Sequence, residues 1–133
     1  MGIVIKAALM CLALNVYHEA RNETMNGQYA VAHVVINRVQ HDRWPDDVCS
    51  VVKQGYVKGR TTCQFSWYCD GKADTPYETR AWALSILVAD DVIRGSSTDI
   101  TKGATHYHAN YVKPYWAKTL RHTVSYGSHK FYK

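Results

Sequence analysis

The chain has 133 residues and a mass of 15.1 kDa, which suits a single domain, 1–133, and leaves no room for a second catalytic module. Apolar residues make up 47% of the chain and charged residues 20%, which excludes a disordered tail and indicates a folded core. The formal net charge is +5, but the basic residues form no dense run. A solvated basic surface and an anionic partner therefore both remain open.

Apolar side chains recur on one helical face near the start of the chain, which predicts an amphipathic helix over about 4–20. This stripe consists of Ile5, Ala8, Leu9, Leu12 and Val16. The segment lacks the basic start and the cleavage site of a secretory signal, and it is too short and too interrupted to span a membrane. We therefore expect a structural helix, with no signal peptide and no stable membrane insertion.

A second helix is predicted over 28–39, after Gly27 breaks the pattern. It is apolar on nearly every face, which is typical of a central, buried helix. Pro45 and the acidic pair that follows it predict the start of a short helix that ends near residue 53 or 54.

Periodicity fades over 55–74, which predicts a long surface loop around a short extended piece, 64–68. A loop of this length inside a compact domain is typically functional. The motif Thr75-Pro76-Tyr77-Glu78 is a capping box and predicts a helix over about 76–94.

The C-terminal part has the patterns of short strands. Residues 103–108 alternate, Pro114 interrupts the chain, and 124–132 reads as a second extended segment after a turn. The expected fold class is therefore α+β, dominated by helices, with a small antiparallel sheet near the C-terminus.

The cysteine spacings match neither a zinc ribbon nor a thioredoxin motif. Cys11 lies in an apolar helical stretch and is expected to be a buried thiol. Cys49, Cys63 and Cys69 flank one loop, so one disulfide among these three is expected if the protein works in an oxidising compartment. The spacing leaves the pairing open.

Glu19 is the first candidate for chemistry, because the apolar stripe of the first helix continues onto it. Partial desolvation raises the pKa of a carboxyl group and keeps it protonated near neutral pH, which suits a general acid in glycosidic bond cleavage. The alternative from residues alone is a solvated Glu19 at the helix end, or one paired with Arg21. Glu23 either shares its face or lies beyond the helix and orients the next loop through its own hydrogen bonds.

Other chemistries have weaker support. His18-Glu19 suggests a metalloprotease, but Asn22 stands where the second zinc-binding His belongs. His106 and His108 share one strand face, and with His129 they make a poor ligand set, so no metal and no cofactor are expected. Ser66 lacks a nucleophile elbow. The basic charge permits nucleic-acid binding, but no motif supports it.

Several blocks in the same order resemble the catalytic domain of spore cortex-lytic enzymes and related bacterial and phage cell wall hydrolases. The resemblance spans about 9–132. Its blocks are residues 15–23, which contain Glu19, residues 27–39, the loop motifs around Trp44 and Cys63-Gln64-Phe65-Ser66-Trp67, and the tail segments 103–109 and 127–132.

This resemblance implies a lysozyme-like fold of the goose-type or lytic transglycosylase-like kind, acting on peptidoglycan with Glu19 as the catalytic acid. The implied reaction cleaves the bond from N-acetylmuramic acid to N-acetylglucosamine. A lytic transglycosylase needs one carboxylate, which acts first as acid and then as base. The chain offers Glu19 few partners besides Glu23 and Asp70, which favours this route; Asp70 is the candidate nucleophile or base if the enzyme is a hydrolytic muramidase.

Residue types that bind sugars suggest the substrate contacts: aromatic rings stack on pyranose faces, and amides and hydroxyls hydrogen-bond to them. The candidates are Gln64, Phe65, Ser66, Trp67, Thr105, Tyr107 and Asn110. For Phe65 and Trp67 core packing is the alternative, and we expect it to hold for at least one of them. Asn37 and Arg38 are expected to support structure near the cleft.

The expected partner is the peptidoglycan glycan strand, with no nucleic acid and a monomeric protein. A bare catalytic domain of this kind suits a phage endolysin that is made in the cytoplasm and acts on the cell wall, and it equally suits a domain trimmed from a longer precursor. A non-catalytic cationic wall-binding module is the alternative, and it predicts salt-sensitive binding without bond cleavage.

Overall fold

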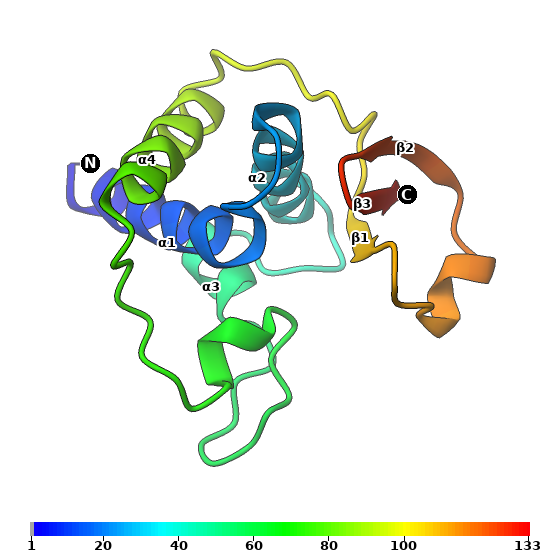
Figure 1. Ribbon diagram of the computed structural model, residues 1–133, viewed down its shortest axis with the longest axis horizontal. Coiled ribbons are helices and arrows are strands. Elements are labelled where there is room, and N and C mark those ends of the chain that lie inside the picture. The colour runs from blue at the N-terminus through cyan, green and yellow to red at the C-terminus, as the bar shows by residue number, and fades with distance from the viewer. Residues whose placement is uncertain (1) are drawn as a thin grey trace.

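The computed structural model describes residues 2–133, with side chains described from Lys6 onward, so Ile5 lies outside the described side chains. The helices are α1 (Gly2–Ala20), α2 (Met25–Val39), α3 (Val48–Val52) and α4 (Thr79–Ile93), with two short 3₁₀ helices, η1 (Ser66–Cys69) and η2 (Tyr115–Lys118) (Figure 1). The strands β1 (His106–Ala109), β2 (His122–Tyr126) and β3 (His129–Tyr132) form an antiparallel sheet in the order β1-β3-β2. The expected helix-dominated α+β class with a small antiparallel sheet is confirmed.

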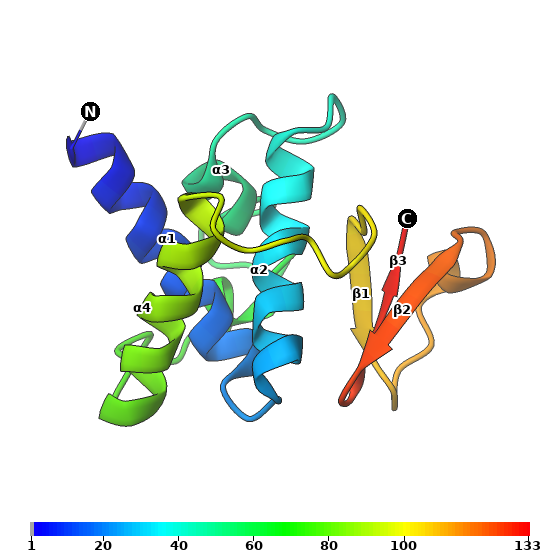
Figure 2. The same ribbon diagram turned by 90° about the horizontal axis from the view of Figure 1, so that it is seen from above.

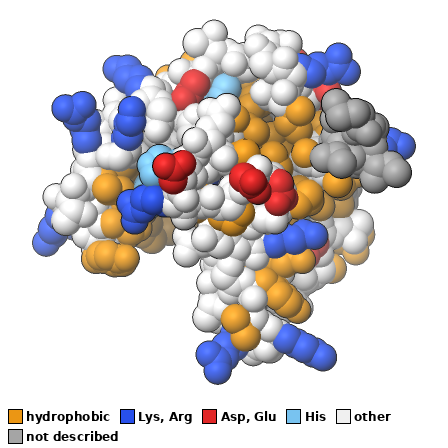
Figure 3. Space-filling view, turned by 180° about the vertical axis from the view of Figure 1, so that it is seen from behind, with side chains coloured by type: hydrophobic (Ala, Val, Ile, Leu, Met, Phe, Trp, Pro, Cys, Tyr) orange, Lys and Arg blue, Asp and Glu red, His pale blue; other side chains and the backbone are white. Residues whose placement is uncertain are grey.

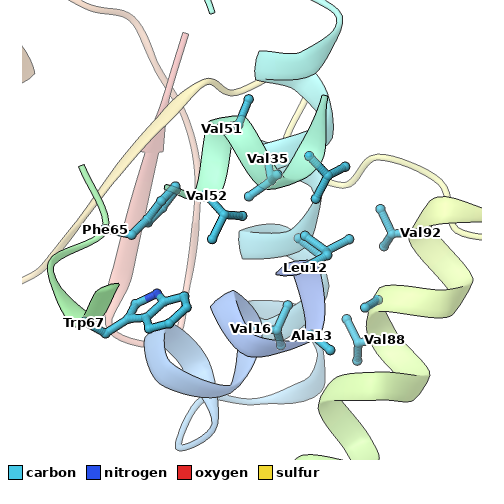
Figure 4. Packing of buried hydrophobic residues seen from close by; sticks show 13 residues of the cluster. Leu12, Ala13, Val16, Val35, Val51, Val52, Phe65, Trp67, Val88 and Val92 are labelled. Carbon is cyan, nitrogen blue, oxygen red and sulfur yellow. The ribbon is translucent and has the colours of Figure 1, made fainter. Parts of the chain in front are cut away.

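The core lies where α1 packs against α2, α3 and α4. Leu12 and Val16 of α1 are fully buried among valines of the other helices, and Phe65 and Trp67 close the cluster from the loop (Figure 4). A second cluster joins the opposite side of α2 to the sheet through Val31, Val34 and Phe131. Figure 2 shows α2 between the other long helices and the sheet, which explains why its sequence is apolar on nearly every face.

Two helix starts differ from the prediction. Helix α2 begins at Met25, one turn before Gln28, because the side chain of Thr24 accepts a hydrogen bond from the Gly27 amide at 3.3 Å and caps the helix. Gly27 therefore lies inside the helix, and its prediction as a break is wrong. Helix α3 is capped by Asp47, whose side chain accepts from the Ser50 amide at 2.9 Å, as the acidic pair after Pro45 indicated.

The predicted capping box at Thr75 is wrong. Residues 75–78 are not helical, and α4 begins at Thr79 after Glu78, whose side chain makes no capping hydrogen bond. The reason is tertiary: the Glu78 amide donates to the Tyr17 hydroxyl at 3.0 Å, and the Glu78 carboxylate accepts from the Arg21 guanidinium. These contacts hold the segment extended across the end of α1.

The prediction of an extended piece at 64–68 is also wrong, because residues 66–69 form η1. A disulfide between Cys63 and Cys69 closes this short loop, and a second disulfide joins Cys11 of α1 to Cys49 of α3. Cys11 is therefore not a free thiol. Further along, residues 124–132 are not one extended segment but parts of β2 and β3, which turn at Gly127. None of the helices in the described part of the chain is long and apolar enough to cross a bilayer.

Candidate active site

Glu19 lies in the last turn of α1, at the edge of a cleft of about 400 Å³. The cleft is bounded by the end of α1, by η1 and by the extended segment before α4. Its lining consists of Tyr17, His18, Glu19, Arg21, Ser66, Trp67, Asp70, Lys72, Ala73, Asp74, Thr75 and Tyr77. Four residues singled out from the sequence, Glu19, Ser66, Trp67 and Asp70, thus meet at one hollow.

The Glu19 carboxyl group is held from the sheet side. The hydroxyl of Tyr107, on β1, donates a hydrogen bond to Glu19 Oε1. Burial raises the pKa of Glu19, and this effect exceeds the opposing effects of the Tyr107 hydrogen bond and the positive charge of Arg38. Burial and the neighbouring Glu19 charge also raise the pKa of Tyr107 far above its usual range, so the phenol stays a donor. A carboxyl group with a raised pKa beside a cleft is suited to general acid catalysis.

Arg38 of α2 places a positive charge near Glu19 and Tyr107. Its guanidinium is buried, donates from Nε to the Thr105 carbonyl at 2.7 Å, and lies over the rings of Trp44 and Phe65. Arg38 therefore ties α2 to the start of β1, next to Tyr107. The sequence suggested a supporting role for Arg38 near the cleft, and its contacts are those of such a residue.

Trp67 forms the floor of the cleft rather than an exposed platform. Its indole Nε1 donates to the buried Asn15 Oδ1 at 2.8 Å, and its ring stacks on His18 with centroids 4.6 Å apart. His18 Nε2 in turn lies 2.9 Å from the Asp74 carbonyl oxygen, to which it donates. Trp67 and His18 thus hold the floor of the cleft against α1.

Two acidic side chains, Asp70 and Asp74, line the cleft besides Glu19. Burial raises the pKa of Asp74, His18 opposes the shift, and the charge of Asp70 adds to it. The sequence does not point to Asp74, because its neighbours Thr75 and Glu78 have the pattern of a helix cap. Tyr17 was likewise missed, although it stands two residues from Glu19 in the same motif.

The other candidates lie elsewhere. Gln64 is exposed on the loop but does not line the cleft, and Phe65 is buried in the hydrophobic core cluster. Thr105 is buried, with its hydroxyl 3.0 Å from His106 Nδ1. Asn110 lies at a separate groove on the other side of the sheet.

Glu23 acts as a clamp between the turn after α1 and the β2–β3 hairpin. Its carboxylate accepts hydrogen bonds from the Ser128 amide at 2.9 Å and the Ser128 hydroxyl at 2.7 Å. Burial opposes its ionisation, but these bonds and the nearby His129 prevail and lower the pKa of Glu23. Glu23 lies beyond the end of α1 and does not line the cleft with Glu19.

The clamp leads to a stability prediction at Gly127. Its φ is +55°, and an added Cβ would lie 2.5 Å from Glu23 Oε1. Gly127→Ala should therefore lower the free energy of unfolding by more than the roughly 1–2 kcal/mol of left-handed backbone strain. Gly59→Ala is the matched control, because Gly59 has a φ of +79° and open space around it. Equal losses in the two variants, measured by urea unfolding, would contradict the clamp.

The Tyr107 hydrogen bond predicts a pH effect. Glu19 must be protonated to act as an acid, so kcat/KM should fall as pH rises through its raised pKa. Tyr107→Phe removes a contact that lowers this pKa, so the alkaline limb should move to higher pH. Tyr29→Phe, which removes a hydroxyl bonded to Asp91, should leave the profile in place. If the alkaline limb of the pH profile does not move in Tyr107→Phe, the Tyr107 hydrogen bond does not lower the pKa of Glu19.

The three histidines considered as metal ligands have separate partners. His106 packs against Trp44 and Trp116, His108 hydrogen-bonds to Tyr132, and His129 lies near Glu23. Over residues 2–133, the structure contains no group of His, Cys, Asp or Glu side chains arranged to hold a metal ion.

Comparison with known proteins gives relatives for both sequence and fold. The chain is 34% identical over 100 residues, 74% of its length, to the spore cortex-lytic enzyme of Halalkalibacterium halodurans, and it spans about a quarter (26%) of that protein. The catalytic domain of the germination-specific lytic transglycosylase SleB from Bacillus anthracis superposes with a TM-score of 0.74 at 29% identity, covering 95% of this chain and 93% of that one.

The catalytic domain of the Bacillus cereus SleB protein gives a TM-score of 0.70 at 28% identity, covering 96% of this chain and 91% of that one. These superpositions confirm the lysozyme-like α+β fold that the sequence resemblance implied. The sequence model of a family described as Cell Wall Hydrolase matches residues 22–132, so the chain belongs to the cell wall hydrolase family of enzymes.

Proposed function

We propose that this protein degrades peptidoglycan by cleaving the bond from N-acetylmuramic acid to N-acetylglucosamine, as a lytic transglycosylase that forms 1,6-anhydro ends. The observation that carries the proposal is the Glu19 carboxyl group, whose pKa is raised by burial and which lies at the edge of a cleft. The similarity to a lytic transglycosylase catalytic domain supports the same reaction.

In the first step, protonated Glu19 gives its proton to the glycosidic oxygen as the bond to C1 of the muramic acid breaks. In the second, the resulting carboxylate accepts the proton of the C6 hydroxyl while that oxygen bonds to C1 and closes the anhydro ring. Glu19 ends the cycle protonated, so the reaction requires no second carboxylate.

The neighbours of Glu19 suit both steps. Tyr107 donates to Oε1, which orients the carboxyl group and leaves Oε2 available to the substrate. Arg38 supplies a fixed positive charge that stabilises the carboxylate after the proton has left, without a salt bridge strong enough to keep Glu19 ionised beforehand.

Hydrolysis is the second candidate, because Asp70 lines the same cleft as Glu19. In a muramidase, Asp70 would activate water or attack C1 itself. The third candidate is a protein that binds the cell wall without cutting it, and one experiment distinguishes all three.

The test is mass spectrometry of soluble muropeptides after purified peptidoglycan has been incubated with the wild type and with Asp70→Asn. Anhydro-muramoyl ends from both proteins are expected. Reducing muramic acid ends that disappear in Asp70→Asn would instead establish the muramidase, and intact glycan with the wild type would leave only binding.

We also propose that the protein is a phage endolysin, made in the cytoplasm and acting on the cell wall as a monomer. The two disulfides support action in an oxidising compartment, since such bonds persist outside the reducing cytoplasm. Size-exclusion chromatography with light scattering would test the monomer.

A further inference from the structure

A second groove lies on the side of the sheet that faces away from the catalytic pair. It has a volume of about 500 Å³ and is bounded by β1, by η2 and the segment before it, and by β3. Side chains alternate along a strand, so Tyr107 points toward Glu19 while His108 points to the opposite face. A ligand in this groove therefore leaves the Glu19 cleft free.

The groove is cationic. Its lining includes Lys113, Lys118 and Lys130 and contains no Asp or Glu. Among the described residues, none of these three lysines takes part in a salt bridge. Three unpaired ammonium groups around one hollow favour an anionic ligand with several charges.

The floor and rim of the groove are aromatic. His108 Nδ1 donates to the Ala109 carbonyl at 2.8 Å, and His108 Nε2 then accepts from the Tyr132 hydroxyl at 2.9 Å. Tyr115 stands at the rim with 89% of its surface exposed. Seen from behind, the sheet side at the left of Figure 3 carries basic side chains with hydrophobic ones between them. The ligand should therefore combine anionic groups with short apolar segments.

We propose that this groove binds the stem peptides of peptidoglycan through their carboxylates. This inference rests on the proposed function, which places the protein on a polymer whose peptide branches carry several carboxylates on short aliphatic chains. The lysines would pair with the carboxylates, and Tyr115 would pack against the aliphatic part. Because the peptide is covalently attached to the glycan, holding it raises the effective concentration of the glycan strand at the cleft.

The kinetic test compares two triple variants. Lys113→Gln/Lys118→Gln/Lys130→Gln empties the groove of charge, and Lys6→Gln/Lys58→Gln/Lys133→Gln removes three exposed charges outside the groove; each lowers the net charge from +5 to +2 (5 − 3). On intact peptidoglycan, the groove variant should raise KM about tenfold with kcat unchanged, since each exposed pair contributes modestly. The control should change KM by less than about twofold. On glycan strands freed of peptides by an amidase, both variants should match the wild type.

Two kinetic outcomes would overturn the proposal. Equal KM increases in the two variants would mean that net charge, and not the groove, sets KM. A KM increase of the groove variant that is as large on peptide-free strands as on intact peptidoglycan would mean that the groove holds glycan.

A binding measurement keeps this inference separate from the proposed function. Titration of free stem tetrapeptide into the ¹⁵N-labelled wild type should shift the amide signals of His108 and Lys130, with the shifts lost in the groove variant. Unshifted signals would refute the peptide site even if the enzyme is active. A peptide-binding protein that leaves the glycan intact would refute only the proposed reaction.

Discussion

Glu19→Gln should lower the rate of glycan cleavage by about 10³-fold, within the roughly 10²–10⁴-fold range of general acid catalysis. Gln keeps the size of the side chain and still accepts the Tyr107 hydrogen bond, but it cannot give a proton to the leaving oxygen. The melting temperature should stay the same or rise, because a partly buried carboxyl group is replaced by a neutral amide. Release of soluble muropeptides, together with thermal melting, measures both quantities.

Glu23→Gln is the matched control for this experiment, since it changes the same functional group in the clamp. It should lower stability while leaving kcat close to that of the wild type, because Glu23 does not line the cleft. If Glu19→Gln still cleaves the glycan, or if Glu23→Gln loses as much kcat as Glu19→Gln, then Glu19 is not the general acid.

Loss of the Cys11–Cys49 disulfide should be the most destabilising change at the cysteines. The bond joins residues 38 apart in sequence, and restriction of the unfolded chain by a loop of this length contributes about 4 kcal/mol. The Cys63–Cys69 bond joins residues 6 apart, for which the same relation gives about 2 kcal/mol. Cys11→Ala/Cys49→Ala should therefore melt well below Cys63→Ala/Cys69→Ala.

Activity should rank the two variants in the opposite order. The 63–69 loop carries Ser66 and Trp67 to the cleft, whereas Cys11 and Cys49 lie outside its lining. At a temperature where both variants are folded, cleavage should fall more in Cys63→Ala/Cys69→Ala. Measurements of melting and muropeptide release on both variants check the two rankings, and the same order in both would contradict this separation of stability from site geometry.

The sequence pointed to Glu19 through a local pattern and a family resemblance together, since the pattern alone left a solvated Glu19 open. Glu19 continues a stripe whose members Leu12 and Val16 are fully buried, so its partial burial follows from helical periodicity. The second helix was recognised as central for a similar reason, since apolar residues on every face need partners on every side.

What the sequence could not reveal depends on contacts between distant segments. Thr75 begins a capping box by its neighbours, but Tyr17 and Arg21 hold Glu78 outside the helix. The Cys11–Cys49 bond depends on how α1 packs against α3, which spacing does not encode. Tyr107 was chosen for sugar binding, whereas its hydroxyl meets Glu19 across 88 positions of sequence.

The strand order has a consequence for how this protein folds. Tyr107 lies on β1, which pairs with β3, and β3 lies between β1 and β2 in the sheet. The phenol that donates to Glu19 is therefore held by a strand that follows it in the chain, with Tyr107 paired opposite Phe131. Because β3 must pair with β1 to hold Tyr107 in place, the contact between Tyr107 and Glu19 should form late in folding.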